Sequence, residues 1–203
     1  YQLFQAINPT LDDQKIKEMI LYYVFRVDSS DERASLRLEQ KIAEVPGYAT
    51  ILQLKGAMEN ILLLVALGDK EGLREYKPLI SDEEVEELIE SDKSSSEFRE
   101  LIEDIGERIT GEVRRLTMDW AKKVTQNPEA TPAELLLAYD GISEYAGGLE
   151  KFAQMVNDPK DPFNCAQARD YLFGKFAQPA GGQVAGAAQQ SMPIVRKGPF
   201  TSL

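Results

Sequence analysis

The densest group of residues that could do chemistry is an acidic stretch between positions 82 and 104. Within it, Glu83 and Glu86 are three positions apart, and so are Glu100 and Glu103. Residues three apart on a helix share a face, so two neighbouring antiparallel helices could bring the four carboxylates together. Carboxylate oxygens are the ligands that Mg²⁺ prefers in proteins. One interpretation of this stretch is therefore a magnesium site.

The two glutamate pairs resemble the ExxE and ExxD elements of all-α nucleoside triphosphate pyrophosphohydrolases. The resemblance is confined to the stretch from Glu83 to Glu103, and its second pair is ExxE rather than ExxD. It implies Mg²⁺-dependent hydrolysis of nucleotides, which we keep as an alternative function. Glu83 and Glu86 also fall where a helix is expected to begin, and acids in a first turn suit the helix dipole. We therefore favour a solvated acidic face and expect no cofactor.

The chain has no histidine and a single cysteine, Cys165, which excludes many kinds of site. Serine triads, Cys-His nucleophiles and Cys/His zinc sites all need residues that are missing here. We expect Cys165 to be a small buried residue on a helix. One cysteine without a disulfide partner also favours a reducing compartment, cytoplasmic or equivalent. Residue 1 is Tyr rather than Met, so any targeting segment would not be visible.

The formal net charge is −11, from 23 basic and 34 acidic residues. A surface of that sign repels phosphate backbones and anionic lipid, which disfavours direct binding to nucleic acid or to membranes. The longest apolar run, residues 61–67, is far shorter than the about 20 residues that span a bilayer. We expect a soluble protein without a membrane span. A second alternative function is an acidic regulatory protein that binds a basic partner.

Helix signals recur along the whole chain, and no alternating β-branched run appears. The patterns predict an all-α fold, a single domain over residues 1–177 with about seven to nine helices around one sizeable core. Three capping boxes are expected, in which Ser29, Ser81 and Thr131 pair with the glutamates three positions later. The longest predicted helix runs from about Phe98 to Asn127 and should organise the others.

Two further features concern apolar side chains on the predicted helices. The segment over residues 48–68 is apolar on most faces near its end, so we expect it to be the central buried helix. Tyr22 and Phe25 lie away from the apolar stripe of the predicted first helix, which includes Ile16 and Ile20. These two aromatic residues are candidates for an exposed partner contact.

The last residues, 178–203, contain no Asp or Glu and differ from the rest of the chain. Their first part, rich in Gly, Ala and Gln, has the composition of a flexible linker. Their last part sets apolar and basic side chains among prolines, a pattern suited to adding a strand or filling a groove on a partner. The predicted docking residues are Met192, Ile194, Val195, Arg196, Lys197 and Phe200.

Together these observations favour a non-enzymatic interaction or assembly protein. It could be an adaptor, a chaperone-like factor or a structural subunit of a larger complex, with its C-terminal tail docking on a protein partner. That partner could be another subunit or another copy of the same chain, which would make a homo-oligomer. The magnesium-dependent phosphohydrolase and the acidic regulator are the alternatives.

Overall fold

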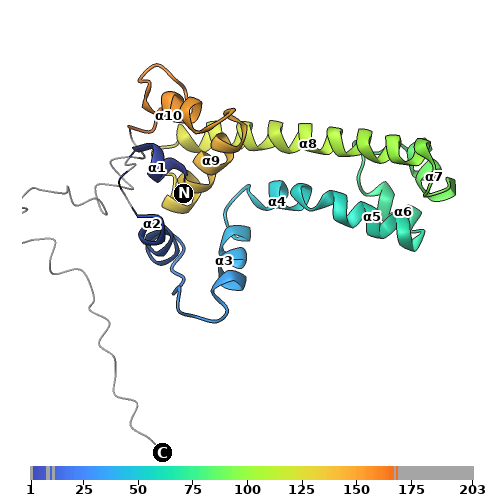
Figure 1. The fold of residues 1–203 in the computed structure, drawn as a ribbon, viewed down its shortest axis with the longest axis horizontal. Helices are drawn as coiled ribbons and strands as arrows, with labels where there is room; N and C mark the ends of the chain where they lie inside the picture. The colour runs from blue at the N-terminus through green and yellow to red at the C-terminus, as the bar shows by residue number, and fades with distance from the viewer. Residues whose placement is uncertain (1, 8–9, 11, 167, 169–203) are drawn as a thin grey trace, which may run out of the picture.

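The computed structural model describes residues 2–7, 10, 12–166 and 168, and in this part of the chain every regular element is a helix. The predicted all-α fold is confirmed (Figure 1). The elements are α1 (Gln2–Ile7), α2 (Asp13–Met19), the π-helix η1 (Ile20–Val24), α3 (Ala34–Ala43), α4 (Ala49–Lys55), α5 (Ala57–Leu67), α6 (Lys70–Arg74), α7 (Asp82–Glu90), α8 (Ser96–Thr125), α9 (Pro132–Tyr145) and α10 (Leu149–Asn157).

The long helix α8 organises the fold, as predicted. It has 30 residues, which correspond to a length of about 45 Å. Figure 1 shows α9, α10 and α1 gathered at its C-terminal end, whereas α7 lies at its N-terminal end and α4, α5 and α6 run beside it. Its most buried positions recur every four residues from Leu101 through Ile105 and Ile109 to Val113, Thr117 and Ala121.

The buried side chains form two clusters along α8 rather than the one sizeable core that was expected. We call the first the terminal core, because it joins residues from 3–52 to residues from 116–168. We call the second the middle core, because all of its members lie between Leu54 and Val113. A helix of this length extends beyond what a single cluster of side chains can cover, so each half of α8 buries its apolar stripe separately.

Local helix signals predicted two of the three capping boxes correctly. Ser81 caps α7 with Glu84, and Thr131 caps α9 with Glu134. The box expected at Ser29 and Glu32 is wrong, because α3 begins at Ala34 without a side-chain cap. Asp28 and Asp31 instead accept hydrogen bonds from the backbone N–H groups two residues further on, which favours turns over a helix there.

The expected seven to nine helices are too few for the described residues, where ten α-helices and one π-helix are found. The segment over residues 48–68 divides at Gly56 into α4 and α5, which meet at an angle of 52°. The first predicted amphipathic helix stops being α-helical at Met19 and continues as the π-helix η1. Arg26 follows with a φ of 58°, a left-handed conformation that ends the helix.

Trp120 fixes the turn between α3 and α4 against α8. Its indole Nε1 donates a 3.0 Å hydrogen bond to the carbonyl of Pro46, and its ring lies 5.0 Å from that of Tyr48. Gly47, between them, has a φ of 75°. A Cβ at that position would come within 3.0 Å of the indole, so both the conformation and the space require glycine.

The predicted tail, residues 178–203, and the domain boundary at residue 177 lie outside the described residues. The same holds for the docking residues Met192, Ile194, Val195, Arg196, Lys197 and Phe200. Their roles stay predictions.

Candidate protein-interaction surface

Helix α5 is bounded by two glycines. Gly56 separates it from α4, and Gly68 ends it with a left-handed φ of 70°. Beyond Gly68, the N–H of Asp69 donates a 3.0 Å bond to the carbonyl of Leu64, which closes the helix end. The Asp69 side chain then accepts from the N–H of Gly72 and so starts α6. The short α6 is thereby held against α5.

One face of α5 is buried in the middle core. Ala57 and Ile61 are fully buried, and Val65 is only 6% exposed. These residues are four positions apart and line the face toward α8 and α6. Contact with α6 is close, since a Cβ at Gly72 would lie 2.6 Å from Cδ2 of Leu64. This inner face anchors α5 in the middle core.

The opposite face of α5 is apolar and exposed. Leu62, Leu63 and Leu67 are 45%, 57% and 71% exposed, and Ala66 between them is exposed as well. We call these four residues the leucine face. They recur at helical spacings of three and four, so they lie side by side. The expectation that residues 48–68 form the central buried helix is therefore wrong for this half of the segment.

The leucine face is unusual among the described surfaces. Three other large apolar residues of the described part are more than a third exposed, and they lie on three different elements, η1, α3 and α10: Tyr22, Leu36 and Leu149. Scattered single apolar residues are normal on protein surfaces, whereas a contiguous group marks a contact site. The leucine face is therefore the strongest candidate for a functional surface in the described part of the chain.

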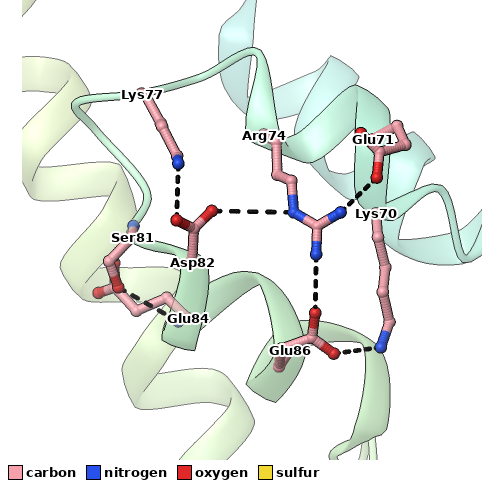
Figure 2. A network of polar contacts seen from close by, with 8 residues as sticks. All are labelled: Lys70, Glu71, Arg74, Lys77, Ser81, Asp82, Glu84 and Glu86. Carbon is pink, nitrogen blue, oxygen red and sulfur yellow. Dashed lines mark hydrogen bonds and ion pairs between the residues drawn. The ribbon is translucent and has the colours of Figure 1, made fainter.

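A network of charged side chains joins α6 to α7 and supports the middle core from outside. Figure 2 shows Arg74 between three carboxylates, those of Glu71, Asp82 and Glu86. Its Nη2 donates to Glu86 at 3.0 Å, and its Nε lies 3.8 Å from Asp82. Lys70 also contacts Glu86. These pairs hold α6, and with it the end of α5, against α7.

A second link ties α7 to α8. Arg108 donates to both carboxylate oxygens of Glu84, at 2.6 and 3.2 Å. The same carboxylate accepts from the backbone N–H of Ser81 in the capping box. The hydrogen bond from Arg108 is the main reason that the pKa of Glu84 lies below its ordinary value. Glu84 and Arg108 also line a shallow, open hollow together with Asp104 and Glu107.

The four glutamates of the magnesium interpretation are not brought together. Glu86 points toward Lys70 and Arg74, whose charges already balance it, and the hydrogen bond from Lys70 lowers its pKa. Glu83, Glu100 and Glu103 are exposed. No group of three or more His, Cys, Asp or Glu residues in the described ranges is placed to hold a metal ion.

The other candidates from the sequence have mixed outcomes. Tyr22 is 42% exposed, whereas Phe25 is only 6% exposed and belongs to the terminal core. Phe25 is therefore not an exposed aromatic residue, because the turn after η1 directs it inward. Cys165 is buried as expected, at 1% exposure, but it lies in a loop before the next helical residues rather than on a helix.

Sequence reasoning missed the leucine face although its signal was visible. The run from Ile61 to Leu67 is apolar at seven consecutive positions, more than one buried face of a helix requires. Such a run means either burial on all sides or a second, exposed apolar face. Only the structure distinguishes these outcomes, because it shows what packs on each side.

In the described part of the chain no single helix is long and apolar enough to cross a membrane. Only α4 and α5 taken together reach that length and composition, across their 52° bend. Comparisons with protein-family models, with curated proteins and with solved structures find no match to this chain, so its function has to be inferred from its own residues.

Proposed function

We propose that this protein is a non-enzymatic interaction or assembly factor that binds a protein partner through the leucine face of α5. The observation that supports this most directly is the exposure of Leu62, Leu63 and Leu67, at 45%, 57% and 71%. These side chains lie outside both cores, whereas the opposite face of α5 is buried in the middle core. Apolar side chains grouped on one exposed helix face are typical of helix-mediated recognition.

The leucine face is small, so covering it contributes only a modest binding free energy. Burying one leucine completely contributes about 1.5–3 kcal/mol, so covering the exposed parts of three would contribute about 3 to 5 kcal/mol. Association of separate molecules costs at least about 4 kcal/mol in lost freedom of motion. A stable complex therefore needs further contacts around the leucine face, or a partner that is tethered nearby.

Ion pairs hold together the helices next to the leucine face. The ionic contacts of Arg74 and Lys70 fix α6 against α7, and the Glu84–Arg108 pair fixes α7 against α8. Binding surfaces on such supported helices lose little freedom of motion when a partner docks. The acids around α5 also disfavour an anionic membrane as the partner.

The test compares two double variants of the full chain. Leu63→Ser with Leu67→Ser removes most of the leucine face, and Leu36→Ser with Leu149→Ser removes two isolated exposed leucines as a matched control. Self-association is measured by analytical ultracentrifugation, and protein partners by affinity capture from the expressing cells. We expect at least a tenfold loss of association for the first variant only. Equal behaviour of wild type and both variants, with equal thermal melts, would contradict the proposal.

A further inference from the structure

The charges around the leucine face favour one kind of occupant. Glu59 precedes the face by one helical turn and Asp69 follows it, and both are exposed. The nearest cations along the chain already have carboxylate partners, since Lys55 pairs with Glu144 and Lys70 with Glu86 and Glu90. An apolar surface with acids at both ends selects an apolar segment that carries positive charge.

This chain contains such a segment beyond its described residues. Between Met192 and Phe200 the sequence has four large apolar side chains around the pair Arg196 and Lys197, with no acid. The remainder of the chain outside residues 178–203 carries a formal charge of −13, from 21 basic and 34 acidic residues. The segment is thus complementary to the α5 surface in both charge and hydrophobicity.

The spacing along the chain allows the segment to reach α5. Ala168 and Met192 are 24 positions apart, and a chain of that length can span up to about 80 Å. By comparison, α8 has 30 residues and is about 45 Å long, and it runs from the terminal core past α5 (Figure 1). The predicted linker itself, residues 178–191, has 14 positions, and a flexible chain of that length has a root-mean-square end separation of about 20 Å.

The occupant could be the tail of the same molecule or that of a second copy, and the strength of the contact favours the first. A short flexible tether holds its end at an effective concentration in the millimolar range. The gain from covering the leucine face barely offsets the cost of bringing separate molecules together, so a tethered occupant is favoured over a free one. We propose that Met192–Phe200 of the same chain folds back over the leucine face and competes there with a protein partner. This inference rests on the proposed function, since it adds regulation to the same surface.

The direct test is a disulfide between the two surfaces in the full-length protein. Leu63→Cys with Ile194→Cys is oxidised mildly at micromolar concentration, and non-reducing electrophoresis then separates internally linked monomers from linked dimers. The one native cysteine, Cys165, is 1% exposed and should not interfere. Leu36→Cys with Ile194→Cys is the control, because Leu36 is also an exposed leucine but lies on α3, whose Leu38 packs against the terminal core.

We expect the Leu63 pair to form an internal disulfide at least fivefold faster than the Leu36 pair. Replacing Arg196 and Lys197 by Gln should slow this reaction at low salt and have less effect at high salt. Equal rates for the two pairs would overturn the proposal. Linked dimers whose yield rises with protein concentration would also overturn it, in favour of a second copy as the occupant.

A deletion of residues 190–203 separates this inference from the proposed function. If the tail covers the leucine face, the deletion should strengthen partner binding or self-association at least threefold. If association depends on Leu63 and Leu67 but does not change on the deletion, the folded-back tail is rejected. The leucine face would then still be a partner-binding surface. If the Leu63→Cys pair forms the disulfide selectively but the leucine substitutions do not affect association, the proposed function is rejected. The folded-back tail would then be retained.

Discussion

Gly141 on α9 lies directly against Thr117 on α8, so closely that a Cβ at Gly141 would be 2.4 Å from Cγ2 of Thr117. Thr117 is fully buried, and its hydroxyl has no hydrogen-bond partner among the described residues. The glycine therefore lets α8 and α9 approach each other closely at this point. Both residues serve the packing of the terminal core rather than a site.

The first prediction follows from that contact. Gly141→Ala should lower the free energy of unfolding by about 1–3 kcal/mol, because the added methyl group overpacks the interface with Thr117. A chemical denaturation curve measures the change. Gly111→Ala is the matched control, because Gly111 lies on α8 with nothing within 4 Å of an added Cβ. Gly111→Ala should raise the free energy of unfolding by up to about 1 kcal/mol, because alanine favours a helix more than glycine does. Equal stabilisation by both substitutions would show that the helices are not in close contact.

The second prediction concerns the buried hydroxyl of Thr117. Thr117→Val keeps the shape of the side chain and removes a polar group that lacks a partner. We expect the free energy of unfolding to stay equal or to rise by about 1 kcal/mol, since a buried unpaired hydroxyl costs that much. Thr125→Val is the comparison, because the Thr125 hydroxyl donates a 2.9 Å bond to the carbonyl of Ala121. A clear loss of stability in Thr117→Val alone would argue that the hydroxyl does have a partner.

The third prediction is a pH dependence at Glu84. Its pKa is lowered in the folded state, chiefly by the hydrogen bond from Arg108. The stabilisation is therefore present above the ordinary pKa of 4.5 and is lost as the pH falls through the lowered folded value. Glu84→Gln should lower the free energy of unfolding by about 1 kcal/mol at neutral pH, and this difference should shrink in acid.

The control for this experiment is Glu83→Gln, on the neighbouring exposed position of α7. Glutamine at position 84 can still accept the bond from Ser81, so the capping box is retained while the charge is lost. Denaturation at a series of pH values from 7 downward gives the difference in free energy of unfolding between each variant and the wild type. A Glu84→Gln difference that stays constant as the pH falls would refute the role assigned to the charge pair.

The fourth prediction concerns Arg74, which contacts three carboxylates at once. Arg74→Gln should lower the free energy of unfolding by about 1 kcal/mol at low salt, because the acids of α6 and α7 then repel one another. The loss should diminish at about 1 M salt, where charges are screened within 3 Å. Arg99→Gln, on an exposed position of α8, should have a smaller effect. Equal losses at both positions would contradict a special role of Arg74.

The features that the sequence predicted correctly are those that depend on near neighbours in the chain. The boxes at Ser81 and Thr131 need only a glutamate three residues later. The extent of α8 follows from a long periodic pattern ended by Asn127 and Pro128. These interactions form within a helical turn or repeat along a single helix, so they can be recognised without knowing the fold.

What could not be predicted depends on partners far along the chain. The contact of Thr117 with Gly141 involves small residues, which contribute no apolar signal to a periodic pattern. Glu86 appeared able to bind a metal, because nothing in the spacing shows that Lys70 and Arg74 reach it from another helix. The exposure of Leu63 likewise depends on which side of α5 meets α8.

The division into two cores has a consequence for the order in which the protein folds. Every member of the middle core lies between Leu54 and Val113, whereas the terminal core needs residues near position 3 to meet residues near position 168. Contacts between distant parts of a chain form more slowly, because a larger loop must close first. During synthesis, the segment from Leu54 to Val113 can therefore collapse while the C-terminal helices are still being made. The N-terminal residues of the terminal core, in contrast, must wait for α9 and α10 before they can be buried.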